Sequence, residues 1–189
     1  HVHDITVSEN QVSGNFNQGI SVSGGTGSTD ATVNNISVLS NHAFNNGNHG
    51  IIASGGTDTL NAAITGMLIN GNLSTGNGTR GIQASSGNTT GTMNSTVRLV
   101  GITDNTASSN ADDGIFIGNG VPGSGSTPVS GNRADRNGVD GIDISSTGYV
   151  ISSNTASRNA ADGINAVGNT NGGGNKATQN ASCNTPGCF

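Results

Sequence analysis

The feature that most constrains the fold is a pair of asparagines, five residues apart, that recurs in a fixed frame along the chain. Four residues after the second asparagine comes a Gly-Ile dipeptide. The frame occurs six times without exception, and a seventh pair, Asn175 and Asn180, follows near the end. The six pairs are Asn10 and Asn15, Asn41 and Asn46, Asn72 and Asn77, Asn105 and Asn110, Asn132 and Asn137, and Asn154 and Asn159. One repeat cannot bury its apolar face alone, so the frame predicts a stack of similar coils.

Apolar residues hold fixed places around the glycine of this dipeptide, which is counted here as position zero. Position +1 is always isoleucine, and positions −12 and +3 hold Val, Ile or Ala. Position −7 is mostly small, which indicates a tight corner facing an opposite wall; its residues are Val12, Ala43, Ser74, Ala107, Ala134 and Ala156. Apolar residues two apart are strand periodicity. The frame therefore predicts three short strands per coil, separated by asparagine or glycine corners.

The asparagines suit such corners because they tolerate left-handed backbone and their amides both donate and accept hydrogen bonds. In a stack, an equivalent asparagine lies about 4.8 Å away in the next coil. We therefore expect the twelve paired asparagines to point inward and form two structural ladders that satisfy the corner backbone.

The stretches from Asn132 to Ile144 and from Asn154 to Ile164 resemble the right-handed parallel β-helix family, the pectin-lyase-like superfamily with short parallel-β-helix repeats. The resemblance implies an all-β fold: a right-handed parallel β-helix, or β-solenoid, of about seven coils over residues 1–182. It is specific for fold rather than activity, because this superfamily includes lyases, hydrolases, epimerases, adhesins and phage spikes.

All variation in repeat length falls on one side of the predicted coil. The glycines of the frame are spaced 31, 31, 33, 27 and 22 residues apart, and the inserted segments are 23–35, 54–66, 85–99, 118–126 and 145–148. The first three contain alternating stretches, Thr29–Val33, Leu60–Ile64 and Met93–Val97, which predict an extra or extended strand. These insertions carry no aromatic residue, and their only charged residues in the first three are Asp30, Asp58 and Arg98. That composition disfavours a carbohydrate groove and favours a structural role.

Composition excludes several classes of protein. Glycine (32 residues) follows no G-X-Y period, which excludes collagen, and the absence of tryptophan with only four phenylalanines disfavours an ordinary globular core. A net charge of −5 with six basic residues disfavours nucleic acid and anionic membranes as partners. No apolar run reaches membrane-spanning length and no signal peptide is present, so we expect a removed leader or a fragment.

Two cysteines, Cys183 and Cys188, flank a Pro-Gly turn signal near the end of the chain. We expect a disulfide that clips residues 183–189 into a terminal loop and indicates an oxidising, extracellular or cell-surface location. Two free thiols remain the alternative.

Charge concentrates in the later repeats. Position −1 reads Gln18, His49, Arg80, Asp113, Asp140 and Asp162, so three carboxylates are predicted to stack, with Asp143 close by. Position −5 holds Arg136 and Arg158. Such groups are candidates for acid–base catalysis or for Ca²⁺ ligation. The structural interpretation is that Asp before Gly is turn chemistry and that the arginines neutralise the column. No resident metal or cofactor is assigned, and Ca²⁺ is the one candidate.

The sequence favours a secreted, non-catalytic β-helical surface, matrix or fibre module. The alternatives are the body of a polysaccharide-active lyase, hydrolase or epimerase with an acidic surface column, and an ice-binding solenoid, which the lack of a repeated Thr-X-Thr column disfavours. A β-helix exposes unpaired strand edges at its ends. At the N-terminal edge we expect either more of the same polypeptide or another subunit, whose head-to-tail stacking gives a filament. Extracellular polysaccharide is the other candidate partner.

Overall fold

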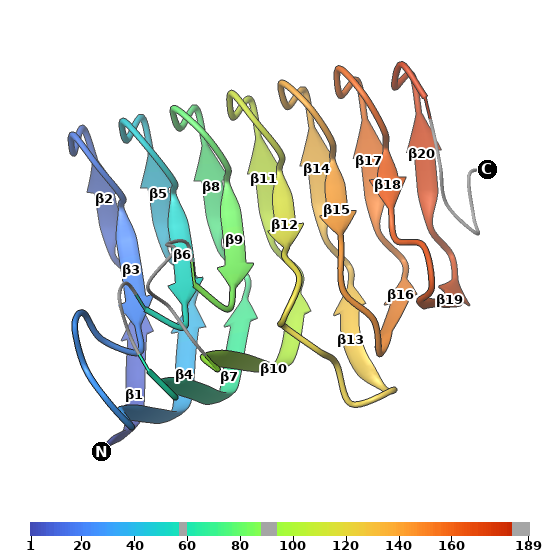
Figure 1. Cartoon of the computed structure of the whole chain (residues 1–189). Helices are drawn as coiled ribbons and strands as arrows, with labels where there is room; N and C mark the ends of the chain where they lie inside the picture. Colours follow the sequence, from blue (N-terminus) through green and yellow to red (C-terminus); the bar gives the residue numbers. More distant parts are fainter. Residues whose placement is uncertain (57–59, 88–93, 183–189) are drawn as a thin grey trace.

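The chain folds as an all-β stack of coils, a parallel β-solenoid (Figure 1). The structure is a computed structural model and describes residues 1–56, 60–87 and 94–182. All regular structure in this part of the chain is β-strand. Strand β1 lies at one end of the stack and β20 at the other. Within the described ranges, no helix is long and apolar enough to cross a membrane.

The strands form three parallel sheets, with seven strands in sheet A, seven in sheet B and six in sheet C. Sheet A runs through β1 (Val2–Ser8), β4 (Thr32–Leu39), β7 (Ala63–Asn70), β10 (Thr96–Thr103), β13 (Thr127–Ser130), β16 (Tyr149–Ser152) and β19 (Thr170–Gly173). Sheet B runs through β2 (Gln11–Ser13), β5 (His42–Phe44), β8 (Leu73–Thr75), β11 (Thr106–Ser108), β14 (Arg133–Asp135), β17 (Thr155–Ser157) and β20 (Lys176–Thr178). Sheet C runs through β3 (Ile20–Ser23), β6 (Ile51–Ser54), β9 (Ile82–Ser85), β12 (Ile115–Ile117), β15 (Ile142–Ile144) and β18 (Ile164–Asn165).

The core is built from columns of equivalent residues, as the periodicity predicts. On sheet A the position −12 residues pair in register from Val7 to Ile151. On sheet C the isoleucines at position +1 pair in register from Ile20 to Ile164. Most of these side chains are fully buried, so the three-strand coil is confirmed and the narrow interior is filled coil by coil.

The small residues at position −7 occupy the middle of the sheet B strands rather than a corner, which corrects part of the expectation. They face the glycine column, and this opposite wall explains their size. A Cβ added to Gly114 would lie 2.6 Å from the Asn137 Nδ2 atom, 2.6 Å from the Gly141 carbonyl and 3.1 Å from Ala134 Cβ. Sheets B and C therefore lie close together here, so the residues on both of them have to be small.

Both asparagine columns form hydrogen-bonded ladders. In each rung, the backbone N–H and the side-chain Nδ2 of one asparagine donate to Oδ1 of the asparagine in the next coil, as Asn105 does to Asn132 at 3.0 Å each. The Nδ2–Oδ1 distances stay between 2.9 and 3.1 Å from Asn10 to Asn175 and from Asn15 to Asn180. The ladders satisfy corner backbone groups that the turns leave without strand partners.

The second column of asparagines forms the same rungs as the first. Nδ2 of Asn46 donates to Oδ1 of Asn77 at 3.0 Å, and Nδ2 of Asn110 donates to Oδ1 of Asn137 at 3.0 Å. Asn46 and Asn110 each expose 2% of their surface, so their inward orientation is confirmed.

The first rung departs from the expectation that all twelve asparagines are inward and enclosed. Asn10 and Asn15 are exposed, whereas the ten paired asparagines from Asn41 to Asn159 are buried. The physical reason is position in the stack: within the described residues, no coil lies before the first one to cover these two side chains.

The early coils carry the extended strands that the insertions predict. Strands β4, β7 and β10 each have 8 residues, whereas β13 and β16 have 4. An isolated bridge between Thr29 and Leu60 extends the pairing of β4 with β7 further. In β10 the register shifts on both sides of Leu99, which marks β-bulges. The offset between β10 and β7 is 33 residues before and after these shifts, so the longer spacing of that repeat arises before Thr96. Asp58, Met93, Cys183 and Cys188 lie outside the described residues, so the disulfide and terminal loop stay predictions.

Candidate functional site

The position −1 column lies at the turn that enters sheet C, and its carboxylates are buried. Asp113, Asp140 and Asp162 expose 3%, 9% and 6% of their surface. Oδ1 of Asp113 accepts the backbone N–H of Asp140 at 3.1 Å, and Oδ1 of Asp140 accepts that of Asp162 at 2.7 Å. Asp113 and Asp140 therefore each cap the backbone of the following coil and form a third ladder, whereas Asp162 Oδ1 accepts the Ser182 hydroxyl at 2.5 Å.

Arg80 continues this column and connects it to the outer face of sheet C. Its Nε donates to Oδ2 of Asp113 at 2.9 Å and lies 3.3 Å from Asp112 Oδ2. Its Nη1 donates to Gln83 Oε1 at 3.0 Å, and its guanidinium stacks 3.7 Å from the centre of the Phe116 ring. An arginine held by ion pairs and a ring is fixed in place.

Asp143 is the carboxyl of this group that is best suited to proton transfer. It pairs in register with Phe116 on the outer face of sheet C and is half-buried. Burial, followed by the charges of Asp113 and Asp140, raises the pKa of Asp143 to about 6. Burial also raises the pKa values of Asp113 and Asp140. A carboxyl that titrates near neutral pH can act as a general acid or base.

His49 lies two coils before Asp113 in the same column, directly beside the coil of Arg80. Its Nδ1 is 2.7 Å from the Thr79 hydroxyl, which donates to Asn48 Oδ1 at 2.7 Å. Because that hydroxyl has one proton, it accepts from a protonated Nδ1. Burial and the Arg80 charge lower the pKa of His49 to about 4, so the imidazole is neutral at pH 7.

Arg136 and Arg158 do not neutralise the position −1 column. Both converge instead on Asp135, the last residue of β14, at distances of 2.6 Å and 3.1 Å between Nη1 and a carboxylate oxygen. Arg133 Nη2 lies 3.6 Å from the same carboxylate, and the Ser157 hydroxyl donates to it at 2.6 Å. Sequence reasoning missed Asp135. The sequence feature that could have revealed it is that Asp135 directly precedes Arg136, while Arg158 has the same frame position as Arg136 in the next repeat.

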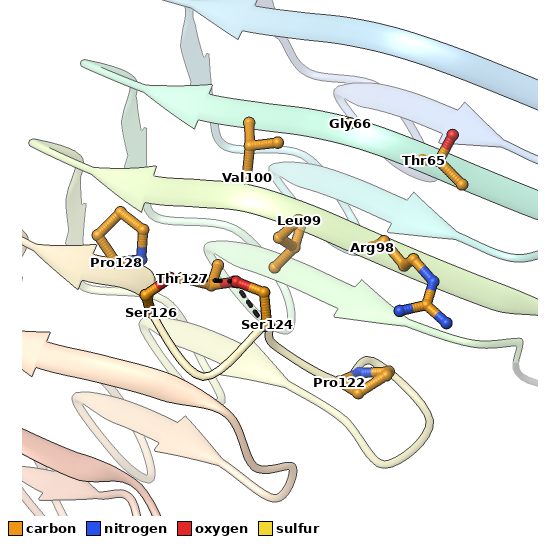
Figure 2. Close-up of a pocket in the computed structure, with 10 residues that line it drawn as sticks. All are labelled: Thr65, Gly66, Arg98, Leu99, Val100, Pro122, Ser124, Ser126, Thr127 and Pro128. Atoms are coloured by element: carbon orange, nitrogen blue, oxygen red, sulfur yellow. Dashed lines mark hydrogen bonds between the residues drawn. The ribbon is translucent and has the colours of Figure 1, made fainter.

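A groove of about 340 Å³ runs along the outer face of sheet A (Figure 2). Its floor includes Leu99 and Val100 from the bulged part of β10, and Arg98 lies at one end. The opposite rim comes from the insertion 118–126 and the start of β13, with Pro122, Pro128 and the hydroxyls of Ser124, Ser126 and Thr127. The groove contains no carboxylate, so acid–base chemistry has no group here.

Within the described ranges, no three His, Cys, Asp or Glu side chains are grouped so as to hold a metal ion. No protein-family model matches the chain, and no curated protein matches it. Among solved structures, the A-module of the mannuronan C-5 epimerase AlgE6 from Azotobacter vinelandii is similar, with a TM-score of 0.40 and 16% identity. The alignment covers 96% of this chain and 59% of that chain, so this chain spans less than two thirds of the A-module's length. A likeness at this level carries no argument about activity.

Proposed function

We propose that the chain is a secreted, non-catalytic β-solenoid module, wound right-handedly, that serves as a structural part of an extracellular assembly. One observation carries this proposal: the stacked candidate carboxylates hydrogen-bond the backbone of neighbouring coils. Asp113 and Asp140 each accept an N–H from the next coil. Asp135 is surrounded by arginines and Ser157. Groups committed in this way stabilise the stack and are poorly placed to exchange protons with a substrate.

Asp143 supports a second candidate, an enzyme acting on polysaccharide. Within the described residues, no backbone N–H donates to its carboxylate, which accepts a long hydrogen bond of 3.4 Å from the Ser145 hydroxyl. Its raised pKa and the neighbouring Phe116 and Arg80 give this face a proton-transferring group, a ring and a cation. A carboxyl for proton transfer and a cation beside it are groups that could act on an acidic sugar.

One set of measurements separates the two candidates. The protein and its Asp143→Asn variant are incubated with polyuronates, and unsaturated products, reducing ends and C5 inversion are followed by absorbance, a reducing-sugar assay and NMR. We expect no turnover, with or without Ca²⁺, and no Ca²⁺-dependent rise in melting temperature. Turnover that Asp143→Asn abolishes at unchanged stability would establish the enzyme instead.

We further propose that the N-terminal edge stacks on the C-terminal coil of a second copy. Oδ1 of Asn10 and Oδ1 of Asn15 accept no hydrogen bond from any described residue, whereas every later rung is filled. At the other end, the backbone N–H groups of Asn175 and Asn180 have no acceptor in the described part of the chain. The first coil also opens an apolar cavity of about 270 Å³ lined by residues that include Val2, Ile5 and Ile36.

Head-to-tail stacking would join these donors to these acceptors and cover the cavity, and such a contact propagates into a filament. Light scattering at increasing concentration should show growing assemblies, and Val2→Lys together with Ile5→Lys should prevent them. A monomer at high concentration would contradict stacking, and would leave covalent continuation as the occupant of this edge.

A further inference from the structure

The strongest positive charge of the molecule lies on the outer face of sheet B in its last coils. Four of the six basic residues of the chain belong to this region: Arg133, Arg136, Arg158 and Lys176. Arg133, Thr155 and Lys176 occupy equivalent register positions in successive strands, so Arg133 and Lys176 lie on one outward column. The acidic column of Asp113, Asp140 and Asp162 lies at the turn into sheet C instead. The basic groups therefore face solvent together, with Asp135 as the carboxylate among them.

Asp135 forms ion pairs with three guanidinium groups. Its side chain is 3% exposed; Oδ1 accepts from Ser157 and Arg158, and Oδ2 lies against Arg136 and Arg133. Burial opposes its ionisation, but the Ser157 bond and the three arginine charges lower the pKa of Asp135 below its ordinary value. One negative charge thus faces three positive ones, whose side chains remain 48–60% exposed. Most guanidinium N–H donors are free to bind a ligand.

The backbone of the repeat places the two arginines alike. Arg136 and Arg158 have φ angles of 57° and 58°, in the left-handed region. The same frame position has a positive φ in the other repeats too, where it holds Gly14, Asn45, Gly76, Ser109 and Gln179. The frame therefore gives both side chains the same point of departure, and in these two successive repeats it directs two guanidinium groups to one carboxylate.

We propose that Arg133, Arg136 and Arg158, held by Asp135, form a binding site for a tetrahedral oxyanion, the sulfate or phosphate monoester of an extracellular ligand. A tetrahedral ester group presents three terminal oxygens, one for each guanidinium, and arginine forks match such oxygens well. Nucleic acid is a poorer fit, because the patch is short and has no aromatic residue on which bases could stack.

The test is calorimetric titration with four probes: inorganic sulfate, inorganic phosphate, a sulfated oligosaccharide and its unsulfated form. The variant is Arg136→Asn with Arg158→Asn, because asparagine already serves this left-handed position at Asn45. Arg98→Asn, which removes an exposed arginine from the sheet A groove, is the matched control. We expect the double variant to bind the sulfated probe at least about tenfold more weakly, and the control to bind it as the original chain does.

The other measurements identify the kind of ligand that carries the anionic group and the arginines that bind it. Tighter binding of the sulfated oligosaccharide than of inorganic sulfate assigns a polysaccharide, and equal affinities assign a small anion. If the double variant does not fold, Arg158→Asn alone replaces it, since Asp135 keeps two arginines, and it should still weaken binding severalfold. The proposal is overturned if the original chain binds no anionic probe, if the arginine variants bind as tightly as it does, or if Arg98→Asn loses as much.

Discussion

The first three repeats and the later repeats share one frame but differ in what they add to it. The early coils add length: β4, β7 and β10 are twice as long as β13 and β16. The later coils add charge, with Asp135 and its three arginines on sheet B and Asp140 and Asp143 at sheet C. Both regions keep the ladders and the glycine column unchanged. The comparison shows that a β-solenoid separates the groups that hold it together from those available for binding.

The sharpest test of this separation is to remove one ladder rung in each region. Asn105→Ala, at the boundary, leaves the Asn72 backbone N–H, the Ile69 carbonyl and Asn132 Oδ1 with fewer partners in a site that is 0% exposed. Buried polar groups that lose their partners cost about 1–3 kcal/mol each, so we expect a loss of at least about 3 kcal/mol in the free energy of unfolding. Chemical denaturation measures it.

Asn41→Ala and Asn132→Ala place the same change in the early and later coils, and their losses should be equal. Asn10→Ala, on the exposed first rung, should cost less than about 1 kcal/mol, because water replaces its partners. Unequal losses for Asn41 and Asn132 would break the comparison, since the two regions would then depend on the ladder to different degrees. If Asn105→Ala leaves the free energy of unfolding nearly unchanged, the ladder is not the main support of the stack.

The glycine column should give the next largest effect, again without regard to region. A Cβ at Gly50 would meet the Ser74 hydroxyl and lie 2.6 Å from Asn77 Nδ2, and Gly114 is similarly enclosed in the later coils. We expect Gly50→Ala and Gly114→Ala each to lower the melting temperature, through a loss of about 1–3 kcal/mol. Gly14→Ala is the control, because it meets nothing within 4 Å and tests only the cost of its φ of 68°. If all three variants lose the same amount of unfolding free energy, crowding is not the reason why the column consists of glycines.

Much of the fold follows from sequence, because a stacked coil repeats its physical constraints. An isoleucine at +1 and small residues at −7 are needed in every coil, so the same requirement is visible six times. The extended early strands were visible for the same reason, as alternation that recurs at the same place in three insertions. The β10 bulges had no such signal, because the spacing that is two residues longer arises before Thr96 and not at the bulges.

The charged groups were harder to place, because their partners come from other positions of the frame and depend on the stack. Arg136 and Arg158 share a frame position and were assigned to the wrong carboxylates, since the sequence does not show that position −5 adjoins Asp135. His49 is distant from the aspartates in sequence, yet the column brings it one coil from Arg80. Stacking converts a sequence separation of 31 residues into direct contact, and only residues that repeat reveal this beforehand.

The later region is followed by two cysteines, which the first coil does not have. We expect Cys183 and Cys188 to be bridged, which mass spectrometry under non-reducing conditions would show as a mass lower by two hydrogens than after reduction. The bridge encloses a short segment, so its contribution to stability is at most about 2 kcal/mol in the chain-entropy model. Two free thiols in the natively purified protein would contradict the bridge and the oxidising compartment inferred from it.

The smallest expected effect is a pH dependence of opposite sign in the two regions. His49, in the second repeat, has a folded pKa of about 4, below its ordinary value of 6.5. The unfolded chain therefore binds the proton first, and this stability is lost as pH falls from about 6.5 to 4. Asp143, in the fifth repeat, has a folded pKa of about 6, above its ordinary 3.8. The folded chain binds that proton first, so this stability is present below pH 3.8 and is lost as pH rises to about 6.

Single substitutions separate these contributions, because both fall in one pH window and partly cancel in the original chain. His49→Gln should leave melting temperatures that fall as pH rises from 4 to 6, whereas Asp143→Asn should leave temperatures that rise over the same interval. Asp30→Asn, which changes an exposed carboxyl in the early coils, controls for the general effect of one charge. NMR titration of the His49 ring and the Asp143 carboxyl gives each pKa directly. If Asp143 titrates near its ordinary value, this face of sheet C has no carboxyl poised near neutral pH, and the later region then differs from the early one in binding capacity alone.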